Sequence, residues 1–456
     1  MAKDRTKDLT QGTPWKVIAG FSLPVIGGNL FQLFYTLADS MIVGRTLGAD
    51  ALAAVGATAT IVYFVLCFIQ GLTGGCGILL GQAFGAGNEK QVRESVSASV
   101  WISALFTIVL TVLCCSMVHP ILRMLNTPVD IYDRTYTYLF IIFLGNGATV
   151  FYNMIFNILR ALGDSRTPLY FLIFSSVLNV VLDVVFIKFL GMGVEGCAYA
   201  TVIAQAVSAV CCMVYIIKKY PILHLEKKNF AFRRGSFAKL LNLGIPMALQ
   251  FSITAIGTII VQGAVNVYGA VYMAGFSAAG KIQNIITMVA VSIGATIATY
   301  VGQNRGAGRM DRVRAGVKYS WIMLLIWAVI EMVVMYFGGR YFTYLFIDPS
   351  ETAVVEVSVT YFRTVFWAYP FLCTIFLFRN ALQGMGYGLV PMLGGVFELV
   401  ARATIVLLVA GRTSFAGVCL ADPTAWIAAL IPLIPYYYYV MKKYKKQTVA
   451  PLSSID

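Results

Sequence analysis

The sequence predicts an all-α polytopic membrane protein with twelve transmembrane helices in two pseudo-symmetric six-helix bundles. Of the 456 residues, 59% are hydrophobic and only 12% are charged, whereas an ordinary soluble domain is about a quarter charged. Apolar stretches of about 20 residues, the length that crosses a bilayer core, recur along nearly the whole chain. Runs such as Ile61–Leu72 are apolar at both odd and even positions, which excludes the alternating pattern of a membrane β-barrel.

The expected spans follow in chain order and are long enough to cross the membrane as helices. They are residues 15–42, 53–80, 95–118, 134–158, 167–188, 194–217, 240–267, 271–301, 316–338, 355–380, 389–411 and 414–440. The first span is too long for the apolar region of a cleavable signal peptide, so we expect it to remain as the first helix.

The basic residues predict the orientation, because cytoplasmic connections are enriched in Lys and Arg. With the N-terminus inside, the outer loops hold only Arg45, Arg123, Arg134, Lys188, Arg340 and Arg412. The basic tail at 442–446 lies on the same side only if the number of spans is even. We therefore expect both termini in the cytoplasm and the chain in the cell membrane. The net charge of +14 then reflects topology and contact with anionic lipid headgroups, not nucleic-acid binding.

An internal repeat divides the chain. Residues 81–93 and 302–314 are identical at seven of thirteen positions and lie 221 residues apart. This offset predicts an N-terminal bundle at 1–217, a basic cytoplasmic linker at 218–239, a C-terminal bundle at 240–440 and a cytoplasmic tail at 441–456. Halves of six spans enter the membrane from the same side, so their symmetry axis should follow the membrane normal. Transporters built in this way bind cargo between the halves and expose it alternately to each side.

Asp39 is the clearest ionisable residue within a span, where a charge costs about 2.5–3.5 kcal/mol on insertion scales. Gln32, Tyr35 and Thr36 share its helix face, at spacings of three and four residues. Pro24 lies earlier in the same helix, and an interior proline removes a backbone hydrogen bond and permits bending. We expect it to act as a hinge or as a static kink.

Asp183 is the second such acid, with Asn179 one turn earlier on the same face and Thr201 within reach on the next span. Two carboxylates brought together in an apolar pocket would repel each other, and one of them would readily bind a proton. Asp39 and Asp183 are therefore predicted to form an ion-binding device. The alternative is that both cap backbone groups or lie near the membrane interface.

The sequence assigns no single role to the other ionisable residues within the spans. Glu398 and Arg402 are four residues apart in the predicted eleventh span, a spacing that suits an ion pair, with either a structural or a functional role. Lys281, Glu331 and Arg363 have no partner that the sequence identifies.

Enzymatic and ATP-driven functions are not expected. Residues 275–281 match the start of a phosphate-binding loop, but Ile282 stands where Ser or Thr should bind magnesium, and no strand precedes the segment. His119 and His224 belong to no nucleophile–base pair, and the nine Cys residues lack metal-ligand spacing. The sequence therefore predicts a transporter without a cofactor, driven by a gradient of H+ or Na+.

Several segments together resemble the multidrug and toxic compound extrusion family of drug/cation antiporters. They are the early Pro24, residues 35–39, the two Gly-Gln-x-x-Gly-Ala-Gly repeats, residues 157–164, and Asn179 with Asp183. The resemblance covers essentially the whole chain and implies two bundles of six helices. It further implies a cation site formed, as in one bacterial branch, by Tyr35, Asp39, Asn157, Asn179, Asp183 and Thr201. Gln32, Thr36 and Pro24 would form the drug-responsive side of the first helix.

What the resemblance implies is antiport of lipophilic, cationic small molecules. The sequence does not determine the oligomeric state, and a monomer is the expectation. Another branch couples through acids of the seventh and tenth helices, where this chain has Gln250 and no acid between Arg363 and Asn380. The main alternative is a lipid-linked saccharide flippase of the same wider superfamily. Such a flippase would favour a strongly basic cavity, whereas we expect only Lys281, Arg363 and Arg402 as basic residues within the membrane.

Overall fold

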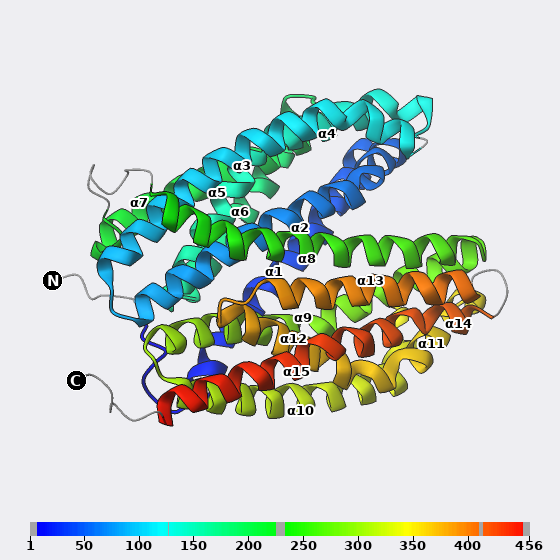
Figure 1. Cartoon of the computed structure of the whole chain (residues 1–456). Helices are drawn as coiled ribbons and strands as arrows, with labels where there is room; N and C mark the ends of the chain where they lie inside the picture. Colours follow the sequence, from blue (N-terminus) through cyan, green and yellow to red (C-terminus); the bar gives the residue numbers. More distant parts are fainter. Residues whose placement is uncertain (1–6, 126, 225–232, 410–413, 450–456) are drawn as a thin grey trace, which may run out of the picture. The chain divides into compact units, whose positions relative to one another are not determined.

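The structure is a computed structural model that describes residues 7–125, 127–224, 233–409 and 414–449 (Figure 1). Over these ranges the chain forms only helices and short connections. It divides into two compact units: unit 1 comprises residues 1–11 and 19–248, and unit 2 comprises residues 12–18 and 249–456. Of the predicted segments, residues 225–232 of the linker, Arg412 and residues 450–456 of the tail lie outside the described part.

Except for the first residues of the first helix, up to Ile18, which belong to unit 2, unit 1 contains the first seven helices of the chain. They are α1 Pro14–Leu47, α2 Ala49–Gly85, α3 Glu89–Met124, α4 Val129–Leu144, α5 Asn146–Ala161, α6 Arg166–Val184 and α7 Val194–Lys219, with a π-helical turn, η1, at Val185–Phe189 and a short 3₁₀ turn, η2, at Pro221–Leu223. α2 packs against α3, α4 and α5, while α7 packs against α4, α5 and α6. Leu72, Leu80, Ile102 and Leu159 are fully buried where these helices meet.

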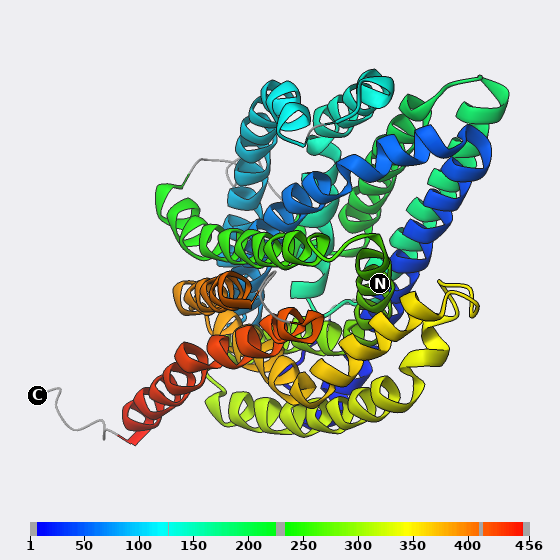
Figure 2. The same cartoon turned by 90° about the vertical axis from the view of Figure 1, so that its right-hand side faces the viewer.

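Unit 2 begins within α8, whose earlier residues belong to unit 1. Its elements are α8 Arg234–Asn266, α9 Ala270–Gly306, α10 Met310–Thr343, α11 Thr352–Val365, the 3₁₀ turn η4 Phe366–Ala368, α12 Tyr369–Gly384, α13 Leu389–Val409, α14 Phe415–Cys419 and α15 Ala421–Val449. α13 and α15 lie side by side (Figure 1), and α12 packs against α9, α10 and α15. α10 is one unbroken helix, yellow-green in Figure 2.

The described helices confirm the predicted number of spans. Eleven of them, some including a short break, are long and apolar enough to cross a membrane, and the bent pair α4–α5 makes a twelfth. The sequence predicted one span at 134–158, and the structure divides this region into α4 and α5, which meet at 46° around Gly145. A Cβ atom at Gly145 would lie 2.2 Å from Cγ2 of Val202, so glycine permits the close approach of α7 at this bend. Most helices also extend beyond the predicted spans, since a helix need not end at the edge of the hydrocarbon.

The predicted repeat appears in the backbone. α2 and α9 each have 37 residues, and each follows a glycine of positive φ, Gly48 at 87° and Gly269 at 95°. Residues with a side chain rarely adopt such φ values, so both positions require glycine. α3 and α10 then begin at Glu89 and Met310, which are 221 residues apart. The two units therefore have a glycine of positive φ and a following helix of equal length at equivalent positions.

Candidate ion-coupling site

Polar side chains from three helices of unit 1 meet around two carboxyl groups. α1 contributes Tyr35 and Asp39, α6 contributes Asn179 and Asp183, and α7 contributes Thr201. Asn179 is 1% exposed and Asp183 is 0% exposed, so neither reaches solvent. The α-helical geometry of α6 ends one residue after Asp183 and continues as the π-helical turn η1. Such local departures from α-helix are frequent at functional sites.

The side-chain amide of Asn179 connects the members of this cluster. In the orientation that satisfies both ends of the amide, its nitrogen donates to Oδ2 of Asp183 at 3.0 Å and to the hydroxyl of Tyr35 at 3.1 Å. Its oxygen then accepts from the hydroxyl of Thr201 at 3.2 Å and from the Thr201 backbone N–H at 3.0 Å. One buried amide thereby holds α1, α6 and α7 around the acids.

Asp39 and Asp183 lie within hydrogen-bonding reach of each other. Two carboxyl groups can be joined in this way only when a proton lies between them, because ionised carboxylates are acceptors alone. One oxygen of each acid, Oδ1, is buried and has no hydrogen-bond partner among the described residues. These two oxygens are therefore free to accept a hydrogen bond or to bind a cation.

Two further residues, which the sequence did not predict, border the acids. Tyr138 of α4 lies within electrostatic reach of Asp39, Asp183 and Cys197, and Cys197 of α7 is 2% exposed beside them. Cys197 stands four residues before Thr201, so its helix face could have indicated it. Tyr138 carries no local signal, because the bend between α4 and α5 determines its position.

The remaining predicted residues lie elsewhere in their helices. Asn157 donates to Oγ1 of Thr73 and to the carbonyl of Asn153, both at 3.0 Å, and so joins α5 to α2. Thr36 donates to the Gln32 carbonyl at 3.0 Å, within α1. Pro24 lies inside α1, which continues without interruption from Pro14 to Leu47. The structure thus unites Tyr35, Asp39, Asn179, Asp183 and Thr201, while Asn157, Gln32, Thr36 and Pro24 have other contacts or positions.

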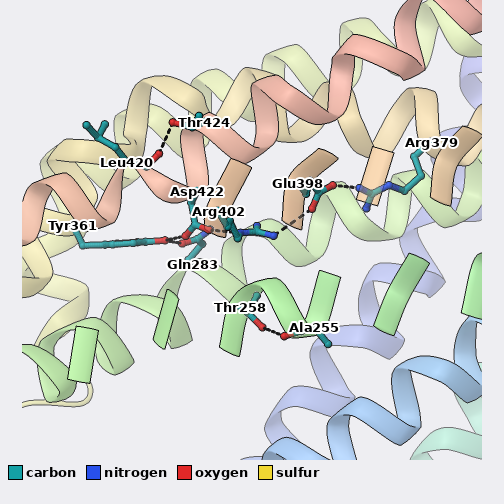
Figure 3. Close-up of polar contacts among 10 residues, drawn as sticks. All are labelled: Ala255, Thr258, Gln283, Tyr361, Arg379, Glu398, Arg402, Leu420, Asp422 and Thr424. Carbon is teal, nitrogen blue, oxygen red and sulfur yellow. Dashed lines mark hydrogen bonds and ion pairs between the residues drawn. The ribbon is translucent and has the colours of Figure 1, made fainter. Parts of the chain in front are cut away.

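Unit 2 contains a separate ionic network, drawn in Figure 3. Nη1 of Arg402 lies 3.4 Å from Oε2 of Glu398, which confirms the predicted pair, and Nε of Arg402 lies 3.1 Å from Oδ1 of Asp422. Arg379 pairs with the other oxygen of Glu398, and the hydroxyl of Tyr361 bonds Oδ2 of Asp422 at 3.1 Å. Two guanidinium groups therefore balance two carboxylates inside the unit.

The network corrects the expectation of three basic residues within the membrane helices. Arg379 is 7% exposed near the end of α12, and Glu398 is 3% exposed beside it. Gly257 of α8 leaves the space for Arg402, because a Cβ atom there would lie 3.0 Å from Nη1. Each Arg is paired with an acid, so the network has no excess positive charge.

Comparison with known proteins agrees with this architecture. The MatE family model matches residues 24–185 and 246–430. The chain is 32% identical over 379 residues to the probable multidrug resistance protein YpnP of Bacillus subtilis (strain 168), covering 83% of this chain and 84% of YpnP. It is 27% identical to the probable multidrug resistance protein YoeA of the same organism, with 96% of each chain covered.

A solved structure has the same fold. The outward-facing conformation of a multidrug resistance MATE family transporter of the MOP superfamily superposes with a TM-score of 0.90 at 21% identity, over 98% of this chain and 100% of that one. From the family match and the relatives together, the chain belongs to the multidrug and toxic compound extrusion (MatE) family, whose members are membrane transporters rather than enzymes.

Proposed function

We propose that this protein is a secondary active antiporter that exports lipophilic cationic compounds in exchange for H+ or Na+ bound at Asp39 and Asp183. The observation that carries the proposal is the meeting of two buried carboxyl groups from α1 and α6, each with an oxygen that has no partner in the described part of the chain. A structural ion pair would instead place a basic side chain between the acids. The relatives named multidrug resistance proteins support export of several compounds as the activity.

The counter-ion acts on α1 through the site. A bound H+ or Na+ removes the repulsion between Asp39 and Asp183, so α1 and α6 can approach; without the ion the two helices separate. Tyr35 and Gln32 share α1 with Asp39, and the interior Pro24 gives this helix a point at which it can bend. Ion binding therefore changes the helix that carries the drug-responsive face, and the cargo leaves from the altered conformation.

Everted membrane vesicles provide the test. Accumulation of ethidium, a fluorescent lipophilic cation, should follow an imposed H+ or Na+ gradient in the wild type, and the ion that supports it identifies the counter-ion. Asp39→Asn removes a carboxylate with little change of size and should abolish this accumulation. Asp133→Asn is the matched control, because Asp133 is exposed on α4, and it should transport like the wild type.

Two outcomes would contradict the proposal. Gradient-driven accumulation that persists in Asp39→Asn excludes the carboxyl pair as the coupling site. Absence of wild-type accumulation for several cations, together with movement of a lipid-linked saccharide in the same vesicles, supports the flippase instead.

A further inference from the structure

Glu331 is a buried acid in unit 2 that the proposed coupling site does not use. It lies in the interior of α10, about six turns from the start and about three turns from the end, and its side chain is 0% exposed. Its neighbours one turn away on α10 are Trp327, Ala328, Val334 and Met335, none of which carries a charge. The acid therefore has no compensating charge on its own helix face.

The contacts of Glu331 come from neutral donors. Nε1 of Trp327 donates to Oε1 at 2.9 Å, and the same N–H lies 3.3 Å from the carbonyl of Ile286 on α9. Sγ of Cys373 on α12 donates to Oε2 at 3.5 Å. No ion pair among the described residues includes Glu331. This differs from Glu398 in the same unit, which two arginines neutralise.

None of the charged side chains on the elements packed against α10 forms an ion pair with Glu331 in the described part of the chain. α9 carries Tyr272, Lys281, Tyr300 and Arg305; α11 carries Glu356, Tyr361 and Arg363; α12 carries Tyr369, Cys373 and Arg379; η4 carries none. Lys281 lies over the ring of Phe346 and Arg305 over that of Tyr387. Arg379 pairs with Glu398, Glu356 pairs with Arg340, and Arg363 is exposed.

A buried carboxylate without a counter-charge is strongly disfavoured, and such a group takes up a proton instead. The neighbours also discriminate between counter-ions. Sodium requires several oxygen ligands, whereas the contacts to both oxygens of Glu331 are N–H and S–H donors, whose hydrogens point at the carboxyl group. These donors therefore oppose a metal cation, while burial without a counter-charge is what favours a proton, because the two donors by themselves stabilise the ionised carboxylate.

A helix break lies beside this acid. The 3₁₀ turn η4 separates α11 from α12 and packs against α10, and Tyr369 and Cys373 follow it within the first two turns of α12. The hydroxyl of Tyr369 is buried and has no partner in the described part of the chain. A 3₁₀ segment within a longer helix often marks a hinge, and movement of α12 there would change the donors around Glu331.

We propose that Glu331 is a second proton-binding site, in unit 2, whose proton exchanges when α12 moves during transport. The exchange step rests on the proposed antiport function, whereas proton binding does not. Coupling in this chain then involves one carboxyl site in each unit. The site in unit 2 lies on α10, which is the ninth predicted span, whereas the other branch of the family uses acids of the seventh and tenth spans.

Infrared difference spectra of the full-length protein in liposomes test proton binding directly. The wild type at neutral pH should show a carbonyl band of a protonated carboxylic acid that disappears at alkaline pH. Glu331→Gln, which keeps the size and the hydrogen-bond acceptor for Trp327, should lose the Glu331 component of this band and keep any component of the Asp39–Asp183 pair. Glu356→Gln is the matched control, because Glu356 is exposed and paired with Arg340, and it should retain the band. Trp327→Phe should shift the band without removing it, and this variant serves if Glu331→Gln fails to fold.

Transport stoichiometry tests the exchange. In proteoliposomes, Glu331→Gln should move fewer protons per ethidium than the wild type while ethidium export continues. A wild-type infrared spectrum unchanged by both Glu331→Gln and Trp327→Phe would overturn proton binding at Glu331. An unchanged proton-to-ethidium ratio in Glu331→Gln would overturn the exchange. Absence of wild-type ethidium export would instead contradict the proposed function. The infrared test of proton binding at Glu331 would still apply, because it does not depend on transport.

Discussion

Replacement of Asp183 by Asn is expected to abolish ion-driven export while the protein still folds. Asn is nearly isosteric with Asp and retains an acceptor for the amide of Asn179, which now donates to Oδ2 at 3.0 Å. Asp183→Asn removes one of the two carboxylates that bind the counter-ion, so Asp39 no longer has a second carboxylate with which to bind that ion. Gradient-driven ethidium accumulation in vesicles should therefore fall to the level of vesicles without the protein.

A milder variant of the same site separates charge from hydrogen bonding. Tyr35→Phe removes only the hydroxyl that accepts from Asn179 at 3.1 Å, and a typical hydrogen bond contributes about 0.5–1.5 kcal/mol. Apparent ion affinity should thus weaken by roughly 2- to 10-fold, with transport preserved at a steep gradient. Equal loss of transport in Tyr35→Phe and Asp183→Asn, both at wild-type abundance, would contradict the distinct role given to the carboxyl charge.

Removal of Glu398 is expected to cause the largest loss of stability. Glu398 is 3% exposed and accepts from both Arg379 and Arg402, so Glu398→Ala leaves two buried guanidinium groups with only Asp422 to balance them. Breaking a buried ion pair by removing one partner typically costs about 3–5 kcal/mol. Chemical unfolding of the purified protein in detergent should show this decrease in the free energy of unfolding.

Two further variants test the physical cause. Glu356→Ala breaks the exposed pair with Arg340 and should leave stability almost unchanged, because water screens exposed ion pairs. Joint replacement of Arg379 and Glu398 by Met should recover much of the stability that Glu398→Ala loses, since it removes one positive and one negative charge together and leaves Arg402 paired with Asp422. A Glu398→Ala protein as stable as the wild type would show that the network contributes little to unit 2.

The sequence predicts the helix pattern well because hydrophobic length and glycine position are local properties. The repeat at 81–93 and 302–314 correctly anticipates the equivalent ends of α2 and α9. The bend at Gly145 was missed, since it depends on the close approach of Val202 from α7. α15 likewise continues to Val449, beyond the predicted end at 440, because its basic final turns need no apolar environment.

The candidate site was predictable only where its residues share a helix face. Tyr35 with Asp39, and Asn179 with Asp183, follow helical spacing, and the structure brings these two faces together. Asn157 was predicted from the family resemblance to belong to the same site, but its side-chain amide donates to Oγ1 of Thr73 on α2. The bonds of Glu398 to Arg379 and of Arg402 to Asp422 join different helices, so no spacing in the sequence could indicate them.

The most direct test of the central claim measures whether cargo and counter-ion exchange at the Asp39–Asp183 pair. Ethidium is added to the purified wild type in a weakly buffered solution, and released protons are followed with a pH-indicator dye, or displaced sodium with a radioactive tracer. Ethidium binding should release the counter-ion from the wild type, and Asp39→Asn should bind ethidium with this release lost or diminished. Ethidium binding without release of either ion, or equal release from the wild type and Asp39→Asn, would contradict antiport through this carboxyl pair.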